Sequence, residues 1–173
     1  PPAVHFTPTP TENPANHRRD GEVRLIDASP SEKPKCTEDL AFWPVTELAP
    51  LLRTRQISSV ELTKLYLDRL HAQNELLHCV VTFTDGLAMQ QAKRADREIA
   101  AGRYRGPLHG IPWGAKDLMG YPGYKTTWGA PQFKDQVMQA KSTVAQRLDD
   151  AGAVLIAKLA LGAIAMGDKW FGG

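Results

Sequence analysis

Residues 142–157 read STVAQRLDDAGAVLIA, and this stretch decides the fold class. Ser142 is a preferred N-cap residue, Leu148 lies on the apolar face of the helix that would follow, and Gly152 is a typical helix-ending residue. Residues 153–157 are then all apolar, as expected for a strand that is covered on both faces. A helix followed directly by a buried strand predicts a layered α/β fold.

The same alternation of helix and strand is found upstream. Ser58 and Glu61 have the spacing of a capping box, which predicts a helix beginning there. Residues 78–84, HCVVTFT, are short, β-branched and aromatic, and they predict a strand. We expect Asp85 to cap a second helix, which ends at Gly102 in a left-handed conformation.

The first forty residues differ from the rest of the chain. Residues 1–40 are rich in proline and polar side chains, so we expect an extended arm or linker with one short strand at Val23–Ile26. The folded domain is expected over 41–173. The chain opens with two prolines instead of methionine, so we expect that its true start is lost. The compartment therefore stays open between the cytoplasm, taken as the default, and secretion.

Composition excludes several classes of function. The chain has 173 residues, 42% hydrophobic and 23% charged, with a formal net charge of +2. So small an excess of positive charge does not indicate nucleic acid or an acidic membrane surface as a partner. No apolar stretch is long enough for a transmembrane helix. Cys36 and Cys79 do not form a metal-ligand pattern, and we expect neither a metal nor an organic cofactor.

One segment combines glycines and prolines with large aromatic residues around a single lysine. Residues 106–129 read GPLHGIPWGAKDLMGYPGYKTTWG, which favours tight turns over a regular element. Lys116 has three interpretations: a solvated loop lysine, the lysine of a phosphate-binding loop, or a catalytic amine. The second is rejected because Ala115 stands where glycine is required and Asp117 stands where serine or threonine would hold magnesium.

The catalytic interpretation rests on desolvation. If Ile111, Trp113 and Leu118 surround Lys116, burial lowers the pKa of its amine. A neutral amine can accept a proton from a hydroxyl and later return it to a leaving amine. An adjacent carboxylate favours the ammonium form, so this interpretation requires Asp117 to point elsewhere.

The segment resembles the amidase-signature family, whose pattern includes G-P-L-H-G-I-P-x-x-x-K-D followed by T-T-x-G. The matching residues are Gly106, Pro107, Leu108, His109, Gly110, Ile111, Pro112, Lys116, Asp117, Thr126, Thr127 and Gly129. The resemblance covers about 39–173, with a first helix and strand upstream and a helix–strand–helix unit downstream. It implies a three-layer α/β/α sandwich around a mixed sheet, of which this chain is the N-terminal portion, incomplete on its C-terminal side.

The resemblance also implies a mechanism. Members of the family hydrolyse amides with a Ser–Ser–Lys triad, in which one serine attacks and a second relays protons to the lysine. Lys116 matches that lysine, and the two serines are expected in a Gly/Ser-rich segment after Gly173. We therefore expect a small-molecule amide as substrate for the whole enzyme, and no activity from this chain alone.

Two alternatives stay open. One is the glutaminase-like A subunit of a tRNA-dependent amidotransferase. This assignment is weakened because residues 157–160, AKLA, stand where many members have Gly-Lys-Thr-Asn. The other is a catalytically inactive scaffold or interaction module.

Several nearby residues receive no catalytic role. His109 is interpreted as holding the Pro-Leu-His-Gly turn through a bond between its ring and the backbone. Lys158 is interpreted as a snorkelling side chain at a strand end. Thr126 and Thr127 either bond near the site or close a turn. Cys79 is not expected to be a nucleophile, because it lies mid-strand without an activating group.

Overall fold

The computed structural model describes residues 32–173, so the expected strand at Val23–Ile26 lies outside the described residues. The α-helices of this part are α1 (Val45–Arg53), α2 (Ser59–Leu77), α3 (Asp85–Ala100) and α4 (Thr143–Asp150). Its strands are β1 (Val80–Phe83), β2 (Pro112–Lys116) and β3 (Val154–Leu159). Short 3-10 helices are η2 (Thr37–Phe42), η3 (Pro131–Phe133) and η4 (Ala163–Ala165).

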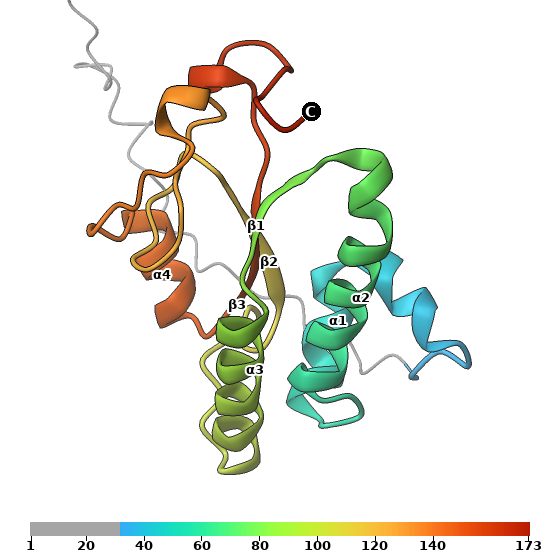
Figure 1. Cartoon of the computed structure of the whole chain (residues 1–173). Coiled ribbons are helices and arrows are strands. Elements are labelled where there is room, and N and C mark those ends of the chain that lie inside the picture. The colour runs from blue at the N-terminus through green and yellow to red at the C-terminus, as the bar shows by residue number, and fades with distance from the viewer. Residues whose placement is uncertain (1–31) are drawn as a thin grey trace, which may run out of the picture.

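The three strands form one mixed sheet with β3 in the centre (Figure 1). β1 runs antiparallel to β3, and β2 runs parallel to it, with Lys116 of β2 opposite Leu159 of β3. A central strand has neighbours on both edges and helices on both faces, which explains the continuous apolar run. All of β3 is buried except its last residue, which is half-buried.

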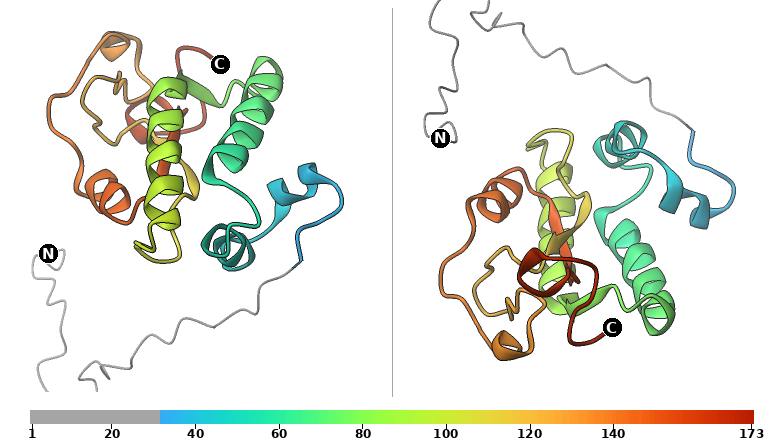
Figure 2. Two further views of the ribbon diagram at one scale, coloured as in Figure 1. Left: turned by 90° about the horizontal axis from the view of Figure 1, so that it is seen from below. Right: turned by 90° about the horizontal axis from the view of Figure 1, so that it is seen from above.

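Helices cover both faces of this sheet. Val154 and Ile156 of β3 pack with side chains of α2 and α3, such as Leu67 and Ala88. Leu155 points the opposite way and packs with Ala145 of α4. Figure 2 shows α2 and α4 on opposite sides of the strands. The predicted three-layer α/β/α arrangement around a mixed sheet is confirmed.

The helix caps were predicted well from local sequence. The hydroxyl of Ser58 accepts a hydrogen bond from the amide of Glu61 at 3.0 Å, and the Glu61 carboxylate accepts from the Ser58 amide at 2.7 Å. Ser142 caps α4. Asp85, however, is not the cap of α3. Thr84 occupies that position, and its hydroxyl donates to the carbonyl of Leu155 in β3 at 2.7 Å instead of capping the helix.

Other elements were missed or differ from the prediction. β2 lies in the glycine-rich segment that was expected to lack regular structure, and α1 had no predicted counterpart. Leu40, in the segment expected to be an arm, is only 2% exposed and packs with α1 and α2. After β3, the described chain has the short η4 where the resemblance implied a second helix.

Candidate active site

Lys116 is the last residue of β2, and its side chain is exposed. Successive side chains of a strand point to opposite faces, so Ala115, which is fully buried, and Lys116 face opposite ways. Trp113 packs in the same cluster as Ala115, and Ile111 packs against α1 and α2. The prediction that apolar side chains surround Lys116 is therefore wrong for residues 32–173. Within these residues the Lys116 amine makes no hydrogen bond or ion pair.

Asp117 follows Lys116 and turns into the protein, where its side chain is fully buried. Its amide donates to the carbonyl of Leu159 at 2.8 Å, which continues the pairing of β2 with β3. One carboxylate oxygen accepts from the ammonium of Lys158 at 2.8 Å. The other accepts from both the amide and the hydroxyl of Thr127. The condition that this carboxylate points away from Lys116 is met.

Lys158 is not a snorkelling side chain. It is fully buried in the central strand, so the earlier interpretation is wrong. Its ammonium donates to Asp117 at 2.8 Å, to the carbonyl of Lys125 at 2.8 Å and to the hydroxyl of Thr126 at 3.0 Å. An ammonium has three donors, and all three are used. Burial lowers the pKa of Lys158, and the contact with Asp117 opposes that shift.

Asp117, Lys158, Thr126 and Thr127 together form a cluster that we call the buried pair cluster. All four side chains are fully buried. The question left open for the two threonines is resolved, because both hydroxyls bond to the charged pair. A lysine inside an apolar run was the sequence signal, since a buried cation requires a partner of opposite charge.

The threonine loop is also joined to the chain that follows β3. Trp128 donates from its amide to the carbonyl of Asp117 at 3.2 Å and accepts from the amide of Ile164 at 2.7 Å. Gly129 has φ of +68°, and a Cβ there would lie 2.2 Å from the carbonyl oxygen of Leu161. The T-T-x-G pattern is therefore explained by two features: its threonines bond to the buried charged pair, and its glycine allows the backbone to approach Leu161 closely.

His109 has the structural role that was predicted for it. Its ring Nδ1 accepts from the amide of Arg105 at 3.1 Å, which closes the turn. Nε2 lies 3.2 Å from the carboxylate of Glu98 without hydrogen-bond geometry. The ring is buried, and this burial lowers the pKa of His109. A Cβ at Gly152 would lie 2.4 Å from the ring, so the glycine that ends α4 leaves room for it.

The serines of the described part have structural roles. Ser58 and Ser142 are helix caps. Ser59 is fully buried and donates to the carbonyl of Gly110 at 2.8 Å. Within residues 32–173, Lys116 makes no hydrogen bond to any of these serines, and the structure gives none of them as its proton donor.

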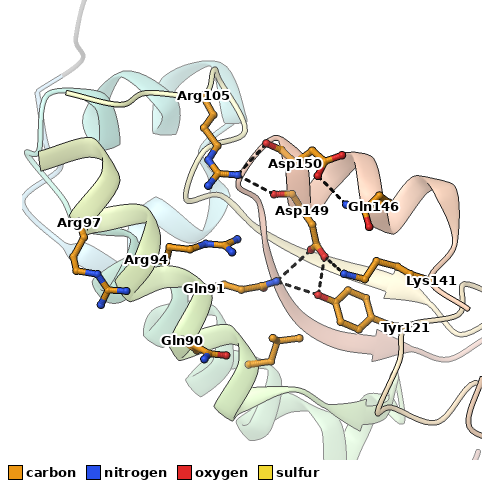
Figure 3. A pocket seen from close by; sticks show the side chains of 11 residues that line it. Gln90, Gln91, Arg94, Arg97, Arg105, Tyr121, Lys141, Gln146, Asp149 and Asp150 are labelled. Atoms are coloured by element: carbon orange, nitrogen blue, oxygen red, sulfur yellow. Dashed lines mark hydrogen bonds and ion pairs between the residues drawn. The ribbon is translucent and has the colours of Figure 1, made fainter. Parts of the chain in front are cut away.

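A cavity of about 420 Å³ lies between α3 and α4 (Figure 3), and no residue of the buried pair cluster lines it. Its floor is a polar network in which Gln91 donates to the hydroxyl of Tyr121 and to Asp149, both at 3.2 Å. The side-chain oxygen of Gln91 accepts from the amide of Leu155, and the ammonium of Lys141 lies 2.5 Å from the carboxylate of Asp149. These groups satisfy one another and fix α4 to α3 and β3, so we assign the cavity a structural origin.

Residues 32–173 contain neither a metal-ligand cluster nor a membrane-spanning helix. No group of three histidine, cysteine, aspartate or glutamate side chains is arranged to hold a metal ion. None of the helices in this part combines the length and the hydropathy that a bilayer crossing needs.

Comparison with known proteins decides the family. The sequence model of the Amidase family matches residues 61–169, a span that contains Lys116 and the whole buried pair cluster. The chain belongs to the amidase-signature family. The resemblance seen in the Gly106–Lys116 motif is thus confirmed over most of the folded part.

Individual amidase-family relatives include both kinds that the sequence left open. The A subunit of glutamyl-tRNA(Gln) amidotransferase from Azoarcus sp. (strain BH72) is 44% identical over 72% of this chain and 26% of its own length. The putative amidase AmiD from Mycobacterium tuberculosis (strain ATCC 25618 / H37Rv) is 38% identical over 79% of this chain and 29% of its own. The peptide amidase from Stenotrophomonas maltophilia superposes with a TM-score of 0.68 at 32% identity, over 73% of this chain and 26% of that one. The chain spans about a quarter of the length of these relatives.

Proposed function

We propose that the full-length protein hydrolyses carboxylic amides and that Lys116 transfers protons in that reaction. The observation that carries the proposal is the position of Lys116 within the family motif, at the end of β2, with the carboxylate of Asp117 held away from it. An exposed amine at a strand end is accessible to a substrate and to chain outside residues 32–173.

The chemistry follows from what a neutral amine can do. Lys116 accepts the proton that an attacking serine loses, through the second serine, as the tetrahedral intermediate forms. It then returns the proton to the leaving nitrogen, which departs as an amine or ammonia. Water afterwards cleaves the acyl–serine ester by the same proton path. In this scheme the residues that shield Lys116 from water belong to the part of the enzyme outside the described chain.

The isolated 173-residue chain is proposed to be inactive. The serines of residues 32–173 are Ser58, Ser59 and Ser142. They are already used as caps or in a buried hydrogen bond, so none of these three is free to act with Lys116. Acyl transfer without a nucleophile or oxyanion donors does not proceed at an enzymatic rate.

The test is Lys116→Ala in the full-length enzyme, assayed by release of amine from simple amides and anilides. Loss of a general base lowers turnover by about 10²–10⁴-fold, and the fold should be intact because the side chain is exposed. Lys93→Ala in α3 is the matched control, since Lys93 is also exposed. Near-normal turnover by the Lys116 variant would refute the proposed role of Lys116. An unchanged protein that releases no amine from any amide would instead support the scaffold alternative.

A glutaminase subunit is the second candidate, and the 44% identity to an amidotransferase A subunit favours it. The two candidates differ in substrate and partner. Release of ammonia from glutamine that requires a co-expressed partner subunit would support the second candidate. Hydrolysis of small amides by the purified full-length protein, without a partner subunit, would support the first.

A further inference from the structure

The buried pair of Asp117 and Lys158 has no evident purpose in stability. Both side chains are 0% exposed, and their charges are 2.8 Å apart. Desolvating two charges costs as much as their attraction returns, and a pair of this kind is often replaced by apolar residues without loss. Its position is the informative feature, because Asp117 is the immediate neighbour of Lys116.

We propose that Lys158 is a positioning residue that neutralises Asp117 and turns its carboxylate away from Lys116, so that Lys116 can act as a proton acceptor. This inference rests on the proposed function of Lys116. It assigns Lys158 no contact with substrate, and its effect is transmitted through Asp117.

The geometry supports both parts of the proposal. The ammonium of Lys158 holds one oxygen of Asp117, and Thr127 holds the other through its amide and its hydroxyl. Both oxygens are engaged by these groups in the interior, away from the exposed Lys116. The pair is also held across strands, because Ala115 lies opposite Lys158 and Lys116 lies opposite Leu159 in the parallel ladder.

The groups around the Asp117 carboxylate set its electrostatic effect on Lys116. An unpaired carboxylate near an amine favours the ammonium form and raises the pKa of the amine. Among residues 32–173, the charged side chain that contacts Asp117 is Lys158, from β3, while the threonine loop presents hydroxyl and amide groups. Lys125 contributes its carbonyl, and its ammonium pairs with Asp135 at 2.8 Å on the surface. The pair is therefore locally neutral beside Lys116.

The test measures the titration of Lys116 directly in the full-length enzyme. Competitive labelling with acetic anhydride across pH, followed by mass spectrometry of the peptide, gives the pKa of one lysine without an activity assay. Lys158→Met leaves the Asp117 charge unbalanced, so the pKa of Lys116 should rise by about one unit. Asp117→Asn leaves the Lys158 cation unbalanced and should lower it. The double variant restores neutrality and should give the original value.

The directions of the Lys116 pKa shifts in the two single variants distinguish this positioning role from a purely structural one. If both single variants lower the melting temperature but leave the pKa of Lys116 unchanged, the proposal is overturned. Thr127→Val keeps both charges and serves if a single variant does not fold. It removes the hydroxyl bond to Asp117 but keeps the bond from the amide, and should give a smaller rise; no rise there would also overturn the proposal.

Failure of the proposed function would look different. In that case Lys116→Ala would keep amide turnover, while the opposite shifts in Lys158→Met and Asp117→Asn could still be observed. Lys93, labelled in the same reaction, is the internal reference and should not shift in any variant.

Discussion

Replacing Lys158 by methionine should destabilise the protein far more than replacing both members of the pair. Methionine keeps an unbranched apolar stem, so the change removes the charge with little change in packing. It leaves Asp117 fully buried without its cation and removes the donor from the carbonyl of Lys125 and the hydroxyl of Thr126. Breaking a buried pair in this way costs about 3–5 kcal/mol.

The double variant Asp117→Asn/Lys158→Met should unfold at nearly the wild-type free energy, within about 1 kcal/mol. An asparagine oxygen can still accept from the amide of Thr127, and no charge stays buried. The assay is urea unfolding of the full-length protein, followed by circular dichroism, with Lys93→Met as a surface control. Equal losses in the single and double variants would refute the reasoning, because they would show that the packing of the lysine stem matters and its charge does not.

Three further outcomes are expected of the same protein. Gly129→Ala should cost about 1–3 kcal/mol in unfolding free energy, because φ is positive there and the carbonyl of Leu161 lies close. The loss should exceed that of the control Gly123→Ala, where φ is also positive but a Cβ meets no atom within 4 Å. Ser58→Ala removes the cap of α2 and should cost about 1 kcal/mol by urea unfolding, an expectation that an unchanged midpoint would contradict. Burial lowers the pKa of His109, so the unfolded state binds a proton more readily than the folded state does. The stability of the protein should therefore be full above the ordinary pKa of 6.5 and should fall as the pH drops below it. In melting curves between pH 7.5 and 5, His109→Gln should make this loss of stability smaller.

Features encoded by neighbouring residues could be predicted from the sequence. The capping box of Ser58 and Glu61, the cap at Ser142 and the left-handed Gly152 depend on backbone groups within a few positions, and the structure has them. The apolar run that became β3 was recognised for the same reason, because burial on both faces needs no knowledge of the partner strands.

Features that depend on distant residues were missed. β2 contains Pro112 and Gly114 and reads as a loop, but pairing with β3 makes it a strand, and a Cβ at Gly114 would lie 2.5 Å from the side chain of Leu159. The burial of Lys158 depends on Asp117, which lies 41 positions away. Local sequence could identify the motif around Lys116, but it could not identify the contact with Lys158 that orients Asp117.

The measurement closest to the central claim is a comparison of two pKa values for the full-length enzyme. One is the pKa that governs the acid side of kcat/KM for amide hydrolysis, and the other is the pKa of the Lys116 amine from competitive labelling. If Lys116 is the proton acceptor, the two should agree within about half a unit and should rise together in Lys158→Met. A kinetic pKa that stays fixed while the Lys116 amine titrates elsewhere would contradict the account.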